Sequence, residues 1–313
     1  MPFNDGIDRK FCFSLTDFHD FDYCLFRFFV FHHLNKKYEL AEGNENMALG
    51  SLLDQTIKIF HQSKAYGQPP EYLENLVKAA LKLMKERVAR QSAPSFYSSI
   101  MPFLTEELVT KAAQIFKNYY STLDGKIRQS LGEVGFCEWI IKTDDPSTLQ
   151  HVQGRPEQGR RTTGSGQVWK LWGGPDALEM GEDGIPEIVD YKFRENTEQG
   201  KTSLDMDLMP KLYTLLCANK LLDMGYKKAR FVVRFWQEPL RNDFYEEFDL
   251  EEVKQYEELF KQKIATILQT KQVSFCEMPF CKACQAKNRK EYLKELEVKK
   301  IIQVDTDILF APA

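Results

Sequence analysis

One short segment constrains this chain more than any other, because it has the pattern of a buried strand and yet carries two charges. Residues 186–193, PEIVDYKF, combine β-branched and aromatic side chains in the manner of a strand. Successive side chains of a strand point to opposite faces, so Ile188, Asp190 and Lys192 share one face and lie roughly 7 Å apart from one to the next. Burial of an unpaired charge is costly, so Asp190 and Lys192 require either a salt bridge at a sheet edge or a ligand such as a metal ion.

Length, composition and charge are those of an ordinary globular protein. The 313 residues, 43% of them hydrophobic, are enough for a sizeable core. The net charge of -4 gives no general attraction to nucleic acid, although it does not exclude a local cationic groove. The first residues lack the pattern of a signal peptide, and no apolar stretch is long enough to span a bilayer. We therefore expect a cytoplasmic protein with no membrane partner.

Helical patterns fill the first part of the chain. Ser and Asp capping residues open an aromatic-rich helix or helix pair over residues 14–34. Apolar residues then recur at helical spacing over residues 45–62, 70–89 and 105–123. These patterns predict a mostly helical region over about residues 1–131.

The pattern then changes to short strands. Residues 135–143, 167–180 and 186–193 predict three adjacent strands, with a polar, mobile loop over 144–167. A helix over 209–225, two strands over 229–237 and 243–250, and a helix over 251–269 follow. The order predicts the α/β class in one domain over 1–313, with a sheet core over about 132–270 and a cysteine segment over about 271–300.

Two acidic residues are expected to meet at one end of a hairpin. The turn GEDGI joins the strand that carries Asp176 to the strand that carries Asp190, so the two carboxylates converge. Converging carboxylates repel each other unless a hard divalent cation such as Mg²⁺ or Mn²⁺ lies between them. A neighbouring lysine, Lys192, can stabilise charge that develops on a phosphate. This chemistry is phosphodiester hydrolysis.

The arrangement Pro175-Asp176 followed by Asp190-x-Lys192 on the next strand resembles the PD-(D/E)XK nuclease superfamily. The surrounding order resembles its RecB-like branch, including the CRISPR-associated and AddB-type exonucleases: an aromatic helix with DYCLFRFF, then ALGSLLD, a helical insertion, the hairpin, a tyrosine-bearing helix and clustered cysteines. This likeness covers nearly the whole chain. It implies a restriction-endonuclease-like central mixed β-sheet flanked by helices, with an N-terminal helical region and a C-terminal cysteine cluster.

The resemblance also implies a function and a set of site residues. The expected activity is metal-dependent hydrolysis of DNA, as an exonuclease on single-stranded ends, with a helicase or CRISPR adaptation proteins as partners. The implied catalytic residues are Asp176, Asp190 and Lys192. The implied Mg²⁺ or Mn²⁺ site consists of Asp54, Asp176, Asp190 and Tyr191. The residues expected to contact nucleic acid are Tyr213, Arg160 and Arg161.

Two positions depart from the pattern of that branch. A histidine that binds metal follows a glycine by four residues there, whereas Gly50 is followed by Asp54 here. An aspartate also binds Mg²⁺ or Mn²⁺, and the alternative is an ordinary surface residue of a helix. A Gln-x-x-x-Tyr pattern contacts nucleic acid in that branch. Tyr213 fits it, but Met209 replaces the glutamine, so packing against the sheet is the alternative for Tyr213.

Other charged residues are weaker candidates. Glu187 faces away from Asp190 by strand parity, and Glu138 is a secondary candidate whose alternative is a solvated strand residue. None of the histidines has a spacing that indicates a catalytic or zinc role. Further basic residues are Arg155, Lys287, Arg289 and Lys290, for which contacts with phosphates and an ordinary solvated face are the two alternatives.

Seven cysteines in a reducing compartment favour thiols or metal ligands over disulfides. Cys276, Cys281 and Cys284 form C-x4-C-x2-C, and Cys24 lies far upstream. Four thiolates suit an iron-sulfur cluster or a structural zinc. Relatives with a 4Fe-4S cluster take one cysteine from the N-terminal helix and three spaced C-x2-C-x5-C. Here Lys290 stands at the last of those positions, so we expect Cys276 to supply the fourth ligand.

Several alternatives stay open at this point. An iron-sulfur cluster, zinc and no metal all remain compatible with the cysteines, whereas a thioredoxin-like role for CKAC fits its position poorly. Cys12, Cys137 and Cys217 are expected to be buried thiols. Asp54 and Met209 favour a rival function, a DNA-binding or assembly subunit with a degenerate nuclease site. A scaffold stapled by zinc, without a nucleic-acid role, is the third alternative.

Overall fold

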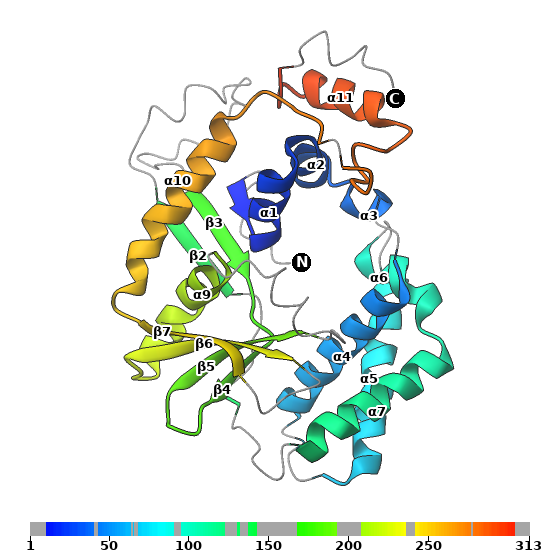
Figure 1. Ribbon diagram of the computed structural model, residues 1–313, viewed down its shortest axis with the longest axis vertical. Coiled ribbons are helices and arrows are strands. Elements are labelled where there is room, and N and C mark those ends of the chain that lie inside the picture. Colours follow the sequence, from blue (N-terminus) through cyan, green and yellow to red (C-terminus); the bar gives the residue numbers. More distant parts are fainter. Residues whose placement is uncertain are drawn as a thin grey trace. The chain divides into compact units, whose positions relative to one another are not determined.

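The computed structural model describes residues 11–40, 43–63, 65, 68–90, 95–122, 130–131, 137–142, 168–192, 208–235, 242–276 and 278–303. The chain divides into two compact units, and each is assembled from segments far apart in the sequence (Figure 1). Unit 1 consists of Met1–Leu34, Phe136–Gly173 and Gln255–Ala313, and unit 2 consists of Asn35–Gly135 and Gly174–Lys254. A single domain over 1–313 stays a prediction.

Unit 1 combines a small sheet with helices from both ends of the chain. Strand β3 (Val168–Gly173) is central, with β1 (Cys12–Phe13) parallel to it on one side and β2 (Cys137–Lys142) antiparallel on the other. The helices are α1 (Leu15–Tyr23), α2 (Leu25–Phe28), a π-helical turn (Phe29–His33), α10 (Tyr256–Gln269) and α11 (Arg289–Val298). Side chains such as Phe13, Phe18 and Phe260 are fully buried in this unit.

The start of each N-terminal helix is fixed by local side-chain contacts. Ser14 and Asp17 form a capping box at α1, because each side chain bonds the backbone N–H of the other. The thiol of Cys24 accepts a bond from the N–H of Arg27 and so caps α2. Asp17 also binds Nδ1 of His32 at 3.0 Å, within the turn that ends the aromatic segment. Capping therefore gives Cys24 a defined position.

Unit 2 combines a helical layer with a mixed sheet of order β4-β5-β6-β7. The strands are β4 (Ala177–Met180), β5 (Pro186–Lys192), β6 (Lys228–Phe235) and β7 (Asn242–Asp249). The helices are α3 (Lys37–Leu40), α4 (Glu45–Gln62), α5 (Pro70–Ala89), α6 (Phe96–Ile100), α7 (Glu106–Thr122) and α9 (Met209–Asp223), with 3-10 turns at Met101–Phe103 and Val253–Gln255.

The topology of this sheet explains how the charged strand is buried. Strands β4 and β5 are antiparallel, β5 and β6 are parallel, and β6 and β7 are antiparallel. A parallel pair needs a crossover, which α9 supplies while it packs on β5 and β6. Helices α4, α5 and α7 pack together, and their core continues onto Ala177, Val189 and Tyr191 of the hairpin. Asp190 lies on the other face of β5 by strand parity.

The predicted class is confirmed as a mixed α/β fold with helices around the sheets and a C-terminal cysteine group. The helices expected over 45–62, 70–89 and 105–123 match α4, α5 and α7 closely. The prediction of three adjacent strands is wrong, because β2 and β3 belong to one sheet and β4 and β5 to the other. The segment 167–180 is interrupted at Gly174-Pro175, where proline has no N–H to donate to a ladder.

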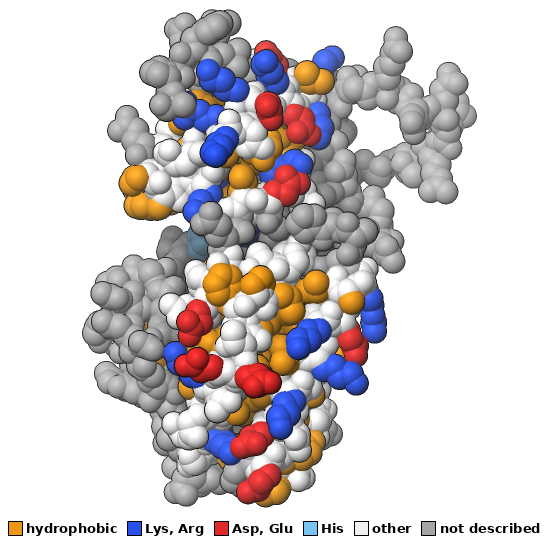
Figure 2. Space-filling model, turned by 90° about the vertical axis from the view of Figure 1, so that its right-hand side faces the viewer, with side chains coloured by type: hydrophobic (Ala, Val, Ile, Leu, Met, Phe, Trp, Pro, Cys, Tyr) orange, Lys and Arg blue, Asp and Glu red, His pale blue; other side chains and the backbone are white. Residues whose placement is uncertain are grey.

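Two further observations concern the surface and the helices. On the face drawn in Figure 2, acidic and basic side chains are interspersed with hydrophobic ones, in keeping with a small net charge. Among the described residues, no helix has the length and apolar character needed to cross a bilayer.

Candidate active site and thiol group

The β4–β5 hairpin brings Asp176 beside Asp190. Asp176 immediately precedes β4, and its N–H donates to the carbonyl of Val189 at 2.9 Å. Its Oδ2 accepts the N–H of Tyr191 at 2.7 Å. These two bonds fix the Asp176 carboxylate against the backbone that flanks Asp190. These bonds therefore hold Asp176 at the end of the hairpin where Asp190 lies.

Asp190 and Lys192 form an ion pair within the sheet. Nζ of Lys192 lies 2.5 Å from Oδ2 of Asp190, and Asp190 is buried. Strand β6 pairs with β5 as far as Lys192, whereas β4 pairs with β5 only as far as Val189, so Asp190 and Lys192 lie just beyond the end of β4 and form the salt bridge that the sequence allowed. Tyr213 of α9 is near enough for Asp190 to influence it electrostatically, and its ring packs 6.1 Å from the ring of Phe231.

Asp54 reaches the same region from α4, but with its own partner. Nζ of Lys58 lies 2.8 Å from each carboxylate oxygen of Asp54 and 4.0 Å from Oδ1 of Asp176. Burial alone would lower the pKa of Lys58, but the carboxylates of Asp54 and Asp176 more than offset this and raise it. Asp54 is therefore a half-buried member of an ion pair rather than an isolated surface residue. Lys58 was not anticipated from the sequence.

The carboxylates influence one another electrostatically. Burial, together with the charges of Asp54 and Asp190, raises the pKa of Asp176 well above its usual value. Burial and the same acidic groups raise the pKa of Tyr213. A hard divalent cation would relieve this repulsion, and carboxylate oxygens are the donors that Mg²⁺ and Mn²⁺ prefer. The residues at the hairpin thus fit such an ion.

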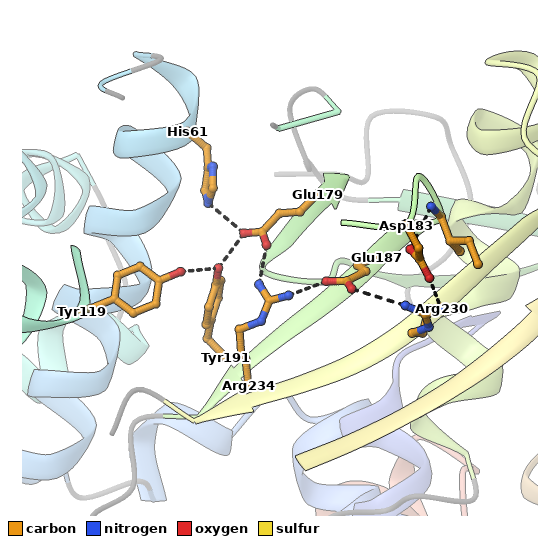
Figure 3. Close-up of polar contacts among 9 residues, drawn as sticks. His61, Tyr119, Glu179, Asp183, Glu187, Tyr191, Arg230 and Arg234 are labelled. Atoms are coloured by element: carbon orange, nitrogen blue, oxygen red, sulfur yellow. Dashed lines mark hydrogen bonds and ion pairs between the residues drawn. The ribbon is translucent and has the colours of Figure 1, made fainter. Parts of the chain in front are cut away.

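A buried polar network lies behind the hairpin, on the face that packs against the helices (Figure 3). The hydroxyl of Tyr191 donates to Oε1 of Glu179 at 2.6 Å and lies 2.9 Å from the hydroxyl of Tyr119 on α7. Nε2 of His61 on α4 lies 3.4 Å from the same oxygen of Glu179. Two helices are thereby tied to the hairpin through one carboxylate and one tyrosine.

Arg234 on β6 joins this network to the neighbouring strands. Its guanidinium binds Glu179 of β4 and Glu187 of β5, and all three side chains are buried (Figure 3). Glu187 lies in turn 3.7 Å from Arg230, which binds Asp183 of the hairpin turn at 2.8 Å. Glu187 therefore faces away from Asp190, as strand parity predicted. A buried pair of this kind is costly to break, because the remaining partner keeps an uncompensated charge.

Most of this network was not predicted from the sequence. Glu179, Arg234 and Tyr119 were not singled out, and the histidines were assigned no role. A signal was present in the strands, since charged residues at buried positions of β4, β5 and β6 require partners. The pairing of Glu179 with Arg234 spans 55 residues, however, so it depends on the sheet order.

The four cysteines come together as expected. The thiols of Cys24, Cys276, Cys281 and Cys284 all lie within 4.8 Å of one another. Sγ of Cys284 is 3.5 Å from Cys24 and 3.8 Å from Cys276, and the contact with Cys284 lowers the pKa of Cys24 to about 5. The same contact raises the pKa of Cys284, and a bound cation would favour the thiolate form of all four cysteines. The geometry supports Cys276 as the fourth member.

This thiol group is tighter than the carboxylate group. Among the described residues, it alone brings three or more candidate ligand atoms of Cys, His, Asp or Glu within 4.8 Å of one another. Asp54, Asp176 and Asp190 therefore do not form an equally compact set. Of the remaining thiols, Cys12 and Cys217 are buried, whereas Cys137 is only half-buried, contrary to the expectation.

The other candidates have the following positions. Glu138 of β2 pairs with the buried Lys170 at 3.0 Å, so it is not simply a solvated residue. Arg289 donates to the carbonyl of Cys284 and lies over the ring of Phe275. Arg155, Arg160 and Arg161 lie outside the described residues.

Comparison with known proteins identifies the class. The family model described as the PD-(D/E)XK nuclease superfamily matches residues 12–289. The match covers most of the chain, and the chain therefore belongs to the PD-(D/E)XK nuclease superfamily. Membership implies a metal-dependent nuclease that hydrolyses phosphodiester bonds, with DNA as its substrate.

Two other comparisons add little. No curated protein matches the chain. Among solved structures, the one described as "Crystal structure of SSO0001" is 13% identical, with 70% of this chain and 74% of that chain covered and a TM-score of 0.23.

Proposed function

We propose that this chain is a Mg²⁺- or Mn²⁺-dependent deoxyribonuclease of the RecB-like branch, similar to the CRISPR-associated and AddB-type exonucleases, and that it degrades DNA from single-stranded ends. The observation that supports this most strongly is the hairpin, which holds Asp176 against the backbone beside the ion pair of the buried Asp190 with Lys192. The matching family supplies the reaction class.

The residues of the hairpin have distinct roles in this proposal. Asp176 and Asp190 would hold the divalent cation, which supplies Lewis-acid polarisation of the phosphate and a nucleophile at neutral pH. Tyr191 holds Asp176 through its N–H, and its hydroxyl is anchored in the network behind the hairpin. Lys192 stabilises the negative charge that develops on the phosphate oxygens. Tyr213 lies beside this site, and we assign it, with Arg160 and Arg161, to contacts with the strand.

The direct test is cleavage by the Asp190→Ala variant. Purified wild-type protein with Mg²⁺ or Mn²⁺ should degrade labelled DNA, and Asp190→Ala should lower the rate by at least about 100-fold, since loss of one essential electrostatic group has effects of this order. The matched control is Glu246→Gln, which alters an exposed carboxylate on β7. Unfolding in urea checks that both variants fold. Equal activity of wild type and Asp190→Ala would rule out the assignment.

The thiol group carries a separate proposal about cofactors. We propose that Cys24, Cys276, Cys281 and Cys284 bind a structural 4Fe-4S cluster, since thiolates alone make up the group. Zinc suits the same four ligands. Protein purified without oxygen should be brown and contain iron and sulfide, whereas colourless protein with one zinc per chain would support the alternative. If the protein is instead a zinc-stapled scaffold with no nucleic-acid role, it should be colourless, contain zinc and fail to bind DNA.

A second function is favoured by one observation at the site. Asp54 is ion-paired with Lys58 on α4, and Met209 stands at the start of α9, so the site departs from the family pattern on two elements. A catalytically degenerate subunit that binds DNA would explain this. Tight DNA binding that depends on divalent cations, with no cleavage under Mg²⁺, Mn²⁺ or Ca²⁺, would support it over the nuclease.

The biological setting is the remaining part of the proposal. We place the protein in the cytoplasm as a single functional domain, with a helicase or CRISPR adaptation proteins as partners. Strands labelled at the 5′ or the 3′ end, offered single- and double-stranded, should be shortened progressively from a single-stranded end. Internal cleavage of circular single strands would instead identify an endonuclease.

A further inference from the structure

Lys58 is a cationic group at the carboxylate site to which the proposed reaction assigns no task. It lies on α4, one helical turn after Asp54, and its ammonium is 2.8 Å from both oxygens of that carboxylate. The same ammonium is 4.0 Å from Oδ1 of Asp176. A third of the Lys58 side chain stays exposed. The group is thus held in place and still reaches solvent.

The contacts of Asp54 argue against a direct role in holding metal. Its Oδ2 accepts a hydrogen bond from Lys58, and its Oδ1 lies 2.8 Å from the same ammonium without a hydrogen bond of its own. Neither oxygen belongs to a set of three ligand atoms within 4.8 Å among the described residues. Residues four apart on a helix lie on the same face, so this pair forms within α4 itself. Asp54 is therefore suited to hold Lys58 in a fixed position.

The charges of the site give Lys58 a task. When a divalent cation is bound and all three carboxylates are ionised, Asp54, Asp176 and Asp190 contribute three negative charges, and Lys58 and Lys192 contribute two positive charges. With the two charges of the cation the local sum would be about +1, which suits an anionic phosphodiester. An ammonium 4.0 Å from Asp176 then lies beside the place where that anion would bind.

We propose that Lys58, anchored by Asp54, is a second phosphate-binding lysine of this site, and that Asp54 is its positioning residue rather than a metal ligand. The inference rests on the proposed DNA substrate. It differs from the sequence expectation, which placed Asp54 among the ligands of the divalent cation. Lys192 contacts the hairpin carboxylate, whereas Lys58 approaches the same place from the helical layer.

The first test measures binding of a single-stranded oligonucleotide by anisotropy in Ca²⁺ at several salt concentrations, with strand integrity checked on a gel. Lys58→Met should weaken binding by about tenfold or more and should reduce the slope of log affinity against log salt by about one phosphate contact. The matched control is Lys111→Met, which removes an exposed lysine of α7 and should leave both quantities unchanged. Lys58→Gln serves if the methionine variant fails to fold.

The second test separates an anchor from a metal ligand. Asp54→Asn should weaken DNA binding as Lys58→Met does, and the double variant should be no weaker than either single variant. Calorimetric binding of Mn²⁺ to the DNA-free protein should keep the wild-type affinity in Asp54→Asn. A tenfold or greater loss of Mn²⁺ affinity there, or an unchanged salt slope in Lys58→Met, overturns the inference.

These outcomes also separate this inference from the nuclease proposal. Wild type that cleaves DNA while Lys58→Met binds normally would remove only the role of Lys58. Wild type that binds DNA without cleaving it, with the predicted loss in Lys58→Met, would remove the nuclease proposal and keep the phosphate contact. Wild type that does not bind DNA at all would remove both.

Discussion

Glu179 is the residue on which the polar network behind the hairpin depends. It accepts bonds from Tyr191 and Arg234 and lies against His61, and its side chain is almost fully buried. Burial alone would raise the pKa of Glu179, but Arg234, His61 and Tyr191 outweigh it and hold the pKa well below the usual value. The carboxylate is therefore charged in the folded state, and its charge stabilises the fold.

The first prediction concerns Glu179→Gln. This variant should lose about 3 kcal/mol of stability near neutral pH, because Arg234 keeps a buried charge with one partner fewer. A carboxyl whose folded pKa is lowered stabilises the protein above its unfolded value of about 4.3, and this contribution is lost as the pH falls below that value. The urea midpoint of Glu179→Gln should therefore change less than that of wild type between about pH 5 and pH 3.

The control for this prediction is Glu246→Gln on β7, where the carboxylate is exposed. It should stay within about 0.5 kcal/mol of wild type at both pH values. A Glu179→Gln variant with the stability and acid sensitivity of wild type would show that the buried pair contributes nothing. Loss of cleavage in the same variant would follow from displacement of Tyr191, which holds Asp176.

At the scale of residues, the sequence predicted what lies close together along the chain. Asp190 and Lys192 were found because their spacing places them on one face of a strand, and Asp176 because a short turn brings it back. Lys58 was missed although it follows Asp54 by one helical turn, a spacing from which their ion pair could have been inferred. Arg234 could not be assigned without the order of the strands.

At the scale of elements, helices were easier to predict than sheets. Apolar spacing of a helix is a local property, and α4, α5 and α7 began and ended within about two residues of the expected positions. Membership of a sheet is not local. β3 and β4 are separated by only a few residues, yet they pair in different sheets, and no periodicity within either strand distinguishes the two.

The second prediction tests the turn of the catalytic hairpin. Gly184 has a φ of +79°, a left-handed backbone conformation that residues other than glycine adopt at a cost. A Cβ added at this position would have no atom within 4 Å, so it would meet no steric clash. Gly184→Ala should therefore cost about 1 kcal/mol from backbone strain alone. Gly184→Asn should cost less, since asparagine tolerates this conformation. Urea midpoints measure both, and equal loss in the two variants would show that strain is not the cause.

At the scale of the whole molecule, the chain returns repeatedly to each of its two units. Unit 1 contains both ends of the chain and a middle segment, and the contact between Cys24 and Cys284 joins residues 260 positions apart. Closing a long loop is entropically costly, so a bound group that fixes both ends stabilises the folded state by a corresponding amount. The spacing of Cys276, Cys281 and Cys284 indicated three members of this group, and the resemblance to relatives with a cluster implied Cys24 as the fourth.

The third prediction is that Cys276→Ala removes the bound iron or zinc and lowers the Tm by roughly 10 °C or more. A four-thiolate site contributes much of its binding free energy to folding, and a loss of 1 kcal/mol lowers the Tm by roughly 2–4 °C in domains of 150–250 residues. Cys137→Ala is the matched control, since this thiol belongs to unit 1 but lies outside the group. It should keep the metal content and the Tm of wild type. Elemental analysis and calorimetry measure both, and full metal content in Cys276→Ala would mean that Cys276 is not a ligand.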